Sequence, residues 1–474
     1  MTDSYDIVAL GSGTTAFAGA LKAADMGARV LLIEQSQLGG TCVNWGCVPS
    51  KTLIDKAATN FAAIRGRAFG VNLTPGPPDC RRLMAAKNKA VEELRRENYQ
   101  NILEGNPRID VKRGHGRFLS PRELQVGAEV LVADRFLIAC GGIPRTARIP
   151  GLSDVDYLTS YSALHLPCFP RSLIILGGGV IALEMGQMFS RFGAQVTIVE
   201  RGERILKDFD QRLTDLFQKQ AEEEGMVFHL GMEAKRVARD GDDILLHIET
   251  GGEEKVVRAE RIMLAIGTAP ATEDIGLDAA GVERDSAGFI RTDAEMATTA
   301  PGIWAAGDCT GPPLIAPAGV REAEVAVENM LFPAGGRRID HRHTPMAVFT
   351  DPEFATVGLP LAQAQETDAT IAVTFLPLEK VAKAHVIGRR HGGILLASEG
   401  ASGRLLGIEI LAPRAADIIH EAVLAVRFGL TVQDLASTVH VYPTLSDGLR
   451  LAALANLRQL GEKQAEISPW QPGP

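Results

Sequence analysis

The chain has 474 residues, which predicts about three domains at roughly 150 residues each, and its 46% hydrophobic content can fill sizeable cores. Its net charge of −9 argues against binding to nucleic acid or to an anionic membrane surface. Six cysteines are too few for a disulfide scaffold, and we find neither a signal peptide nor an apolar run of the ~20 residues that a membrane helix needs. We therefore expect a cytoplasmic protein.

The first chemical signal is a glycine-rich turn between two strands near the N-terminus. Residues 6–10 are expected to form a buried strand, which is followed by Gly11-Ser12-Gly13 and an Ala-rich helix that includes Ala16. A second strand, residues 29–33, ends at Glu34. Small residues let the backbone approach a pyrophosphate at the helix N-terminus, and the acidic residue binds a ribose hydroxyl. The segment therefore predicts a dinucleotide site.

Cys42 and Cys47 follow this unit, with four residues between them. Residues 52–64 lack Gly and Pro and are expected to form a helix, so Cys47 should lie at a helix N-terminus. The helix dipole there would stabilise a thiolate and lower the pKa of Cys47. A close cysteine pair with one activated thiolate can cycle between disulfide and dithiol. We therefore predict a redox-active disulfide bond.

The strand–turn–helix–strand unit then occurs a second time. A strand over residues 173–176 leads into Gly177-Gly178-Gly179, and the strand over residues 195–199 ends at Glu200. In both units the acidic residue follows the first glycine by 23 residues (34 − 11 and 200 − 177). One fingerprint alone is weak evidence, but two in the same context predict two nucleotide-binding domains.

These elements divide the chain into four segments. Residues 1–150 are expected to form the first nucleotide-binding domain, residues 151–268 the second, and residues 269–338 to complete the first. Residues 339–474 form a C-terminal domain. The fold class is α/β, with two Rossmann-like domains followed by an α+β domain. Between the fingerprints, the charged helix from Lys87 to Arg96 is interpreted as a solvated face.

The chain resembles the flavin-dependent pyridine nucleotide-disulfide oxidoreductases, the family of dihydrolipoamide dehydrogenase, glutathione reductase and mercuric reductase. Besides the cysteine segment and the two fingerprints, the resemblance includes residues 299–308, which end in Gly-Asp308, and residues 349–358, which resemble the start of the family's dimer-interface domain. It implies a homodimer, FAD at the first fingerprint, and NADH or NADPH at the second. Asp308 would bind the ribityl chain of FAD.

The resemblance also implies roles around the two cysteines. Reduced nicotinamide would pass a hydride to one face of the flavin, which would reduce the disulfide on its other face. Cys47 would be the thiolate beside the flavin, and Cys42 the exchange thiol that meets the substrate. Lys51 and Glu184 would form an ion pair beside the flavin, with an exposed helix lysine as the alternative for Lys51. Expected flavin-binding residues are Gly11, Gly13, Ala16, Glu34, Gly40, Thr41, Lys51 and Asp308.

The second fingerprint bears on the choice of coenzyme. The charge of Glu200 opposes a 2′-phosphate and favours NADH. Arg201 and Arg204 follow closely, however, and could neutralise a phosphate. Many relatives have Gly-Arg where this chain has Gly267-Thr268, which removes one coenzyme contact. Expected coenzyme-binding residues are Gly177, Gly179, Glu200, Arg201 and Gly267.

The electron acceptor depends on the C-terminal segment. Relatives that reduce lipoamide or glutathione carry a catalytic His, with an acidic residue five positions later; here these positions hold Tyr442 and Asp447. A phenol, with a reference pKa of ~10, is a poor base for thiol exchange near neutral pH. His440 could substitute, but it would be displaced by several ångströms. We interpret His440 as a structural histidine.

Mercuric reductase has a tyrosine at this base position and a second active-site tyrosine on a helix after the redox segment, which Tyr99 resembles. Thiolates bind soft metals well, so Cys42 and Cys47 are candidate transient ligands of Hg(II). The C-terminal cysteine pair of that family is missing, because no cysteine follows Cys309.

We therefore predict an FAD-dependent NAD(P)H oxidoreductase that passes electrons through the Cys42–Cys47 disulfide to a soft-metal or thiol-type acceptor, as a mercuric reductase does. The alternative is an enzyme like dihydrolipoamide dehydrogenase or another low-molecular-weight disulfide reductase. A non-catalytic flavoprotein is a third hypothesis, which the intact cysteine pair and both fingerprints disfavour.

Overall fold

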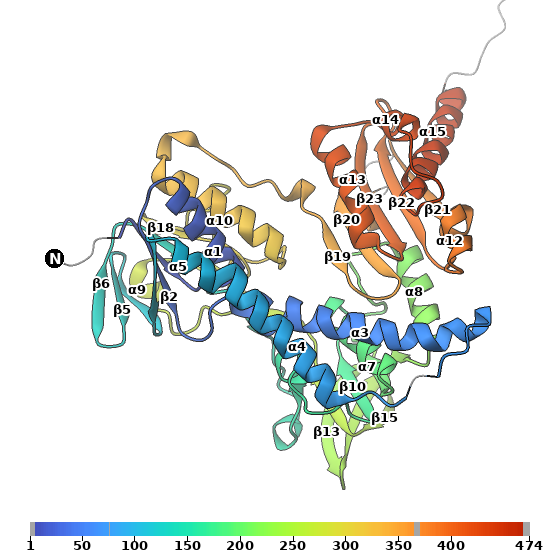
Figure 1. Ribbon diagram of the computed structural model, residues 1–474, viewed down its shortest axis with the longest axis horizontal. Helices are drawn as coiled ribbons and strands as arrows, with labels where there is room; N and C mark the ends of the chain where they lie inside the picture. Colours follow the sequence, from blue (N-terminus) through green and yellow to red (C-terminus); the bar gives the residue numbers. More distant parts are fainter. Residues whose placement is uncertain (1–4, 75, 365–369, 468–474) are drawn as a thin grey trace, which may run out of the picture. The chain divides into compact units, whose positions relative to one another are not determined.

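The computed structural model describes residues 5–74, 76–364 and 370–467, and they form two compact units (Figure 1). The first unit contains the described residues up to Arg148, Tyr157–Phe169 and Met263–His341. The second contains Ile149–Asp156, Pro170–Ile262 and the described residues from Arg342 onward. Within this described part of the chain, no helix is long and apolar enough to cross a membrane.

The first unit is built on a parallel five-stranded sheet with the strand order β18-β7-β1-β2-β3. Its strands are β1 (Ile7–Leu10), β2 (Val30–Glu34), β3 (Ile109–Arg113), β7 (Phe136–Ile138) and β18 (Ile303–Ala305). β1 and β2 agree with the expected strands to within one residue. Both are buried along their whole length, which requires cover on both faces of the sheet.

Alternate residues of β1 and β2 point into two separate cores, as the two-residue period of a strand dictates. One set packs with α1 (Thr14–Asp25) and α10 (Ala316–Leu331), which lie side by side in Figure 1. The other set packs with a small antiparallel sheet formed by β4 (Gly116–Ser120), β5 (Glu123–Val126) and β6 (Glu129–Val132). Packing on both faces of the sheet therefore fixes the ends of β1 and β2, where Gly11 and Glu34 lie.

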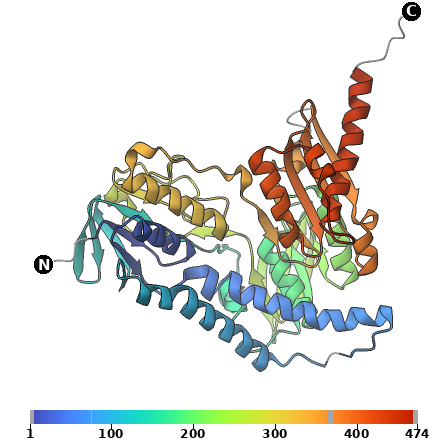
Figure 2. The same ribbon diagram turned by 45° about the horizontal axis from the view of Figure 1, so that its top comes forward.

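Three helices follow β2: α2 (Gly40–Asn44), α3 (Cys47–Gly66) and α4 (Cys80–Arg95). α3 and α4 lie alongside one another (Figure 2), and α4 continues through the π-helical turn η2 (Arg96–Gln100) into α5 (Asn101–Gly105). The helix expected over residues 52–64 is confirmed. The unit also contains the short elements β8 (Gly142–Pro144), β9 (Leu158–Thr159), α6 (Ser160–Ala163), β17 (Thr268–Pro270) and α9 (Leu277–Ala280).

The interpretation of residues 87–96 as a solvated face is wrong at Lys87. Its side chain is buried, and its ammonium group donates a hydrogen bond to the carbonyl oxygen of Leu164 at 2.8 Å. A long aliphatic stem can pack like an apolar side chain while its charged end reaches a backbone acceptor. Burial lowers the pKa of Lys87.

The second unit begins with a parallel sheet that repeats the strand–turn–helix–strand arrangement of the first unit. β10 (Ser172–Leu176), β11 (Gln195–Val199) and β12 (Val227–His229) are parallel, in the order β12-β11-β10, and β16 (Arg261–Leu264) lies beside β10. Helices α7 (Val180–Arg191) and α8 (Gln211–Glu223) connect them. An antiparallel sheet of β13 (Glu233–Asp240), β14 (Asp243–Thr250) and β15 (Glu253–Ala259) follows. Both strands expected around the second fingerprint are confirmed.

The C-terminal part of this unit is an antiparallel sheet covered by helices. The strand order is β19-β20-β23-β22-β21, with bounds Met346–Val348, Glu353–Gly358, Leu405–Ala412, Gly393–Glu399 and Ile371–Pro377. The helices are α12 (Ala382–Val386), α13 (Ala415–Phe428), α14 (Val432–Ser437) and α15 (Asp447–Ile467). The sheet and α13, α14 and α15 enclose one core. The predicted fold class is confirmed.

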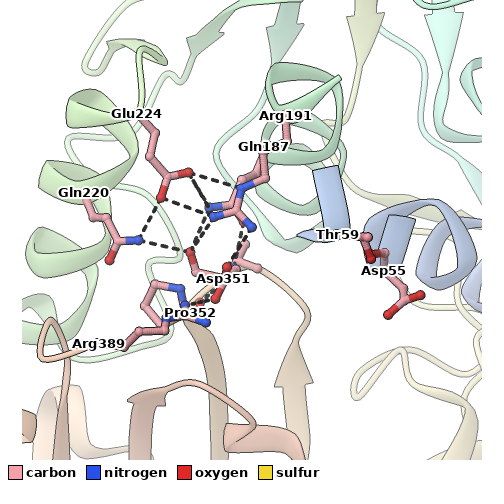
Figure 3. A network of polar contacts seen from close by, with 10 residues as sticks. Asp55, Thr59, Gln187, Arg191, Gln220, Glu224, Asp351, Pro352 and Arg389 are labelled. Carbon is pink, nitrogen blue, oxygen red and sulfur yellow. Dashed lines mark hydrogen bonds and ion pairs between the residues drawn. The ribbon is translucent and has the colours of Figure 1, made fainter. Parts of the chain in front are cut away.

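A buried ion-pair network joins the two parts of the second unit (Figure 3). Arg191, at the end of α7, binds Glu224 at 3.0 Å and Asp351 at 2.8 Å, and its side chain is only 4% exposed. Arg389 forms a second ion pair with Asp351. Gln187 binds the backbone of Asp351 through both its amide oxygen and its amide nitrogen. The chain segment before β20 is therefore attached to α7 by charged and polar side chains.

Glu409, on β23, is a second buried acidic group in this unit. Its carboxylate accepts hydrogen bonds from the backbone N–H groups of Asp210 (2.8 Å) and Leu361 (3.1 Å). Burial raises the pKa of Glu409 to about 7, although these two hydrogen bonds oppose the shift. The carboxyl group therefore titrates near neutral pH in the folded protein.

This pKa predicts a pH dependence of stability. Because folding raises the pKa of Glu409 from 4.5 to about 7, its contribution to stability is complete below pH 4.5 and is lost as the pH rises through 7. A shift of this size corresponds to about 3 kcal/mol. From pH 5 to pH 8, the free energy of unfolding of Glu409→Gln should therefore rise relative to wild type by about 3 kcal/mol in urea titrations.

Glu253→Gln is the matched control, because Glu253 is exposed on β15 of the same unit. Its stability relative to wild type should not change with pH. Parallel pH curves for Glu409→Gln and wild type would contradict the assignment.

Candidate active site

The two cysteines of the predicted redox pair lie on consecutive helices. Cys42 is in α2 and is half-buried, while Cys47 is exposed and is the first residue of α3. The expected position of Cys47 at a helix N-terminus is therefore confirmed. Both are present as thiols, and a hydrogen bond with Cys47, together with burial, raises the pKa of Cys42 well above its ordinary value. The two sulfur atoms are thus close enough to interact directly.

The segment before Cys42 packs against the first glycine-rich turn. Gly40 has a φ of +58°, and a Cβ atom there would lie 2.6 Å from the Cα of Gly13. Gly39 donates a hydrogen bond from its backbone to the carbonyl oxygen of Ser12 at 3.1 Å. Behind the segment, Asn44 donates to the carbonyl oxygens of Leu38 and Gly40 at 3.0 and 2.9 Å. The redox segment and the first fingerprint therefore form one continuous structure.

The first fingerprint has the geometry of a nucleotide site. Gly11 has a φ of +110°, and a Cβ atom there would lie 2.4 Å from the carbonyl oxygen of Ala139. Ala16 is fully buried in α1. The carboxylate of Glu34 accepts hydrogen bonds from the backbone and hydroxyl groups of Ser12 at 3.1 and 2.5 Å. Glu34 therefore lies directly beside the turn, where an adenosine ribose would bind.

Asp308 supports FAD binding by a different observation. Burial and the charge of Glu322 raise the pKa of Asp308. Among the described residues, no side chain or backbone group donates a hydrogen bond to its carboxylate. This half-buried carboxylate can accept a hydrogen bond, and a ribityl hydroxyl of FAD would supply one. The residues of the first unit therefore fit FAD.

The second fingerprint has the same geometry as the first. Gly177 has a φ of +115°, Gly179 precedes the first residue of α7, and Glu200 accepts hydrogen bonds from Gly178 and Gly202 at 2.6 Å each. These residues fit a pyridine nucleotide.

Arg201 and Arg204, which follow Glu200 in the sequence, differ in their surroundings. Arg204 is bound by backbone carbonyl oxygens of its own loop, those of Phe209 and Lys207. Arg201 is exposed. Of the two, Arg201 has the more accessible guanidinium group.

Some predicted partners lie in different units. Lys51 is in α3 of the first unit, whereas Glu184 is buried in α7 of the second, where it accepts a hydrogen bond from the backbone of Phe349 at 2.9 Å. Gly267 lies in the first unit, and its carbonyl oxygen accepts a hydrogen bond from Arg145 at 3.0 Å. The Lys51–Glu184 ion pair and the coenzyme contact of Gly267 stay predictions.

Tyr99 is buried on the π-helical turn η2, close to the cysteine pair. Its hydroxyl lies 3.2 Å from Thr14 Oγ1, and its ring centroid lies 4.6 Å from that of Phe17. Burial raises the pKa of Tyr99, and the charges of Cys42 and Cys47 raise it further. A neutral phenol therefore lies within electrostatic reach of both sulfur atoms.

The C-terminal candidates have three different environments. Tyr442 is 72% exposed. His440 has a partner at each ring nitrogen, Glu421 at 2.9 Å and the carbonyl oxygen of Thr438 at 3.0 Å, as a structural histidine would. Asp447 is buried at the start of α15 and binds Arg450 at 2.7 Å. The structure therefore pairs neither His440 nor Tyr442 with Asp447. The C-terminal segment in which the sequence analysis found no cysteine pair includes residues 468–474, which lie outside the described residues.

Sequence reasoning missed two residues next to the redox pair, Thr14 and Tyr161. Thr14 belongs to the first fingerprint but has no assigned role in it. Tyr161 is 119 residues from Cys42 (161 − 42), and no motif connects the two. Cys309 is fully buried, and Cys140 is half-buried against the same core.

Comparison with known proteins places this site in a family. The sequence matches the pyridine nucleotide-disulphide oxidoreductase family over residues 5–329 and that family's dimerisation domain over residues 344–453. Mercuric reductase from Staphylococcus aureus is 37% identical over 450 residues, which cover 95% of this chain and 82% of that protein. Dihydrolipoyl dehydrogenase from Thermus scotoductus is 35% identical over 459 residues, covering 96% and 98%.

A solved structure agrees with these relatives. The Cu(II) complex of the HOCl-induced flavoprotein disulfide reductase RclA from Escherichia coli superposes with a TM-score of 0.86 at 28% identity, covering 96% of this chain and 99% of that chain. The chain belongs to the pyridine nucleotide-disulphide oxidoreductase family. It is an FAD- and pyridine nucleotide-dependent oxidoreductase with a C-terminal dimerisation domain.

Proposed function

We propose that the protein is a homodimeric NAD(P)H oxidoreductase that passes electrons through the Cys42–Cys47 disulfide to a soft metal ion delivered as a thiol complex. The observation that carries this proposal is the cysteine pair with the buried phenol of Tyr99 beside it. Thiolates are the protein ligands that soft metals prefer. The names of the mercuric reductases and of the Cu(II)-bound relative support a metal acceptor.

The chain's own residues would divide the work as follows. Gly11, Gly13 and Glu34 would hold FAD, and Asp308 would accept a hydrogen bond from its ribityl chain. Bound FAD supplies the transfer of two electrons from NAD(P)H to the disulfide. Reduction of the disulfide leaves Cys42 and Cys47 as thiols. Each would lose its proton and displace one carrier thiolate from Hg(II), and the two displaced carrier thiolates would take up these two protons. Two electrons would then pass from the two cysteine sulfur atoms to Hg(II), which leaves as Hg(0) while the Cys42–Cys47 disulfide forms again.

NADH is the coenzyme that we favour. Glu200 lies at the end of β11 with its carboxylate beside Gly178, where a ribose would bind, and its charge repels a 2′-phosphate. Arg204 is occupied by its own loop, so of these two arginines Arg201 is the one that could offset that repulsion.

Reduction of an organic disulfide is the second candidate, and the similarity to dihydrolipoyl dehydrogenase favours it. It would require a base to move a proton from the leaving thiol. Tyr442 is exposed and phenolic, and His440 would first have to break its contact with Glu421. Because neither residue is ready to act as the base, we place reduction of an organic disulfide second.

Steady-state assays with NADH separate the two candidates. Turnover with Hg(II) in excess thiol, or with Cu(II) supplied without thiol, should exceed turnover with lipoamide or glutathione disulfide. Rapid lipoamide turnover by the wild-type enzyme would contradict the metal proposal.

Two substitutions of Tyr442, the residue at the family's base position, also test whether the acceptor is a metal ion or an organic disulfide. Tyr442→His should raise lipoamide turnover by about tenfold or more, because it supplies the missing base. Tyr442→Phe should lower Hg(II) reduction and leave lipoamide turnover unchanged. The matched control is Tyr5→Phe, which changes a half-buried tyrosine of the other unit and should change neither rate.

A further inference from the structure

One tyrosine outside every motif of the sequence contacts the redox segment on both sides of Cys42. Tyr161 belongs to the four-residue helix α6 of the first unit. Its hydroxyl lies 3.1 Å from Thr41 Oγ1, and its ring stacks on that of Trp45 with 6.0 Å between centroids and 24° between planes. Thr41 precedes Cys42 directly, and Trp45 lies between the two cysteines.

The hydrogen bonds of Tyr161 have a defined direction. Its hydroxyl donates to the carbonyl oxygen of Gly142 at 3.0 Å. A phenol has a single proton, so Thr41 must donate to Tyr161. Burial raises the pKa of Tyr161, which keeps that proton in place near neutral pH. The chain of donors therefore runs from Thr41 through Tyr161 to Gly142.

The acceptor end of this chain is part of the candidate flavin site. Gly142 begins β8, which pairs with β17. A Cβ atom at Gly142 would lie 2.5 Å from Thr268 Cγ2 and 3.3 Å from the Cβ of Asp308, so β8 packs tightly against these two residues. Tyr161 therefore connects the redox segment to a tightly packed strand beside Asp308.

The helix that carries Tyr161 is itself held at both ends. A four-residue helix has little stability of its own. Thr159 and Ser162 form a capping box at its start, and Lys87 binds the carbonyl oxygen of Leu164 at its end. This contact gives the buried ammonium group of Lys87 a structural role.

We propose that Tyr161 is a positioning residue that holds the Cys42 segment in place for attack on the acceptor. This inference rests on the proposed function, in which Cys42 is the exchange thiol. Tyr161 touches neither the acceptor nor the sulfur atoms; it acts through Thr41 and Trp45. Removing its hydroxyl frees Thr41 and leaves the carbonyl oxygen of Gly142 without this donor.

Tyr161→Phe removes only the hydroxyl and keeps the ring on Trp45. We expect the rate of Cys42 alkylation by iodoacetamide in the reduced holoenzyme to change by about three- to tenfold, the effect of one buried hydrogen bond, relative to the exposed Cys168 as internal reference. The kcat for the acceptor should fall by a similar factor with little change in KM. Reduction of the flavin by NADH should be unaffected.

Tyr157→Phe is the matched control, since Tyr157 lies four residues earlier in the same segment and makes no hydrogen bond through its hydroxyl to any described residue. Wild-type alkylation and kcat in Tyr161→Phe would overturn the inference, as would equal changes in Tyr157→Phe. The proposed function fails separately, if Cys42→Ser still turns over the acceptor. In that case, the alkylation rate of Cys42 alone tests the role of Tyr161.

Discussion

Cys42→Ser should lower turnover of every acceptor by about a thousandfold or more, the scale of losing a residue that acts as a unit with its partner. Serine cannot form a disulfide, and its hydroxyl neither ionises near neutral pH nor binds soft metals well. Reduction of the bound flavin by NADH should persist, because that step precedes the cysteine pair. Stopped-flow flavin bleaching and steady-state acceptor assays measure the two steps separately.

Cys168→Ser provides the control, because Cys168 is also exposed but is far along the sequence from the redox segment. It should retain wild-type turnover. A Cys42→Ser enzyme that kept a tenth of the wild-type rate would show that electrons reach the acceptor by another route.

Arg191→Met should lower the free energy of unfolding by about 3–5 kcal/mol. The arginine is almost completely buried and pairs with both Glu224 and Asp351, whose side chains are only 11% and 20% exposed, so its loss removes one counter-charge from each of these carboxylates. Arg389 still pairs with Asp351, whereas Glu224 keeps only amide donors such as Gln220 (2.8 Å). Urea unfolding followed by circular dichroism measures the change.

Arg171→Met tests whether burial is the cause. Arg171 also pairs with a glutamate of the same unit, Glu260, at 3.2 Å, but its side chain is 83% exposed. An exposed pair contributes about 1 kcal/mol or less, so this variant should unfold almost like wild type. Equal losses in the two variants would contradict a special role for the buried network.

The parts of the fold that follow local rules were predictable from the sequence. β1, β2, β10 and β11 follow from short apolar runs, and Gly11 and Gly177, which come directly after β1 and β10, have a positive φ that other residues rarely adopt. The helix that begins at Cys47 follows from a run without Gly or Pro. Each of these inferences uses residues that are neighbours in the chain.

The contacts that could not be predicted join residues distant in sequence. Lys87 is buried only because the end of α6, 77 residues later, offers it a carbonyl oxygen. Tyr161 reaches Thr41 across 120 residues, and Glu409 reaches Asp210 across 199. Charge and polarity in a local window predict exposure for such residues, whereas tertiary contacts bury them.

The Tyr442 segment is a different case. The sequence indicated that Tyr442 occupies the family's base position, but it did not indicate which residues His440 and Asp447 contact. His440 binds Glu421 of α13, and Asp447 binds Arg450 within its own helix. Asp447, the acidic residue at the expected spacing, therefore pairs with a residue of its own helix, and the spacing alone does not predict this pairing.

The contact between Gly13 and Gly40 has a consequence for how this site can diversify. Backbone meets backbone there, with no side chain between the nucleotide-binding turn and the turn that carries Cys42. Main-chain geometry therefore fixes how the turn that carries Cys42 lies against the nucleotide-binding turn. We expect that neighbouring side chains such as Trp45 and Tyr99 can vary in evolution or by design, and alter what the cysteines accept, while this main-chain contact stays the same.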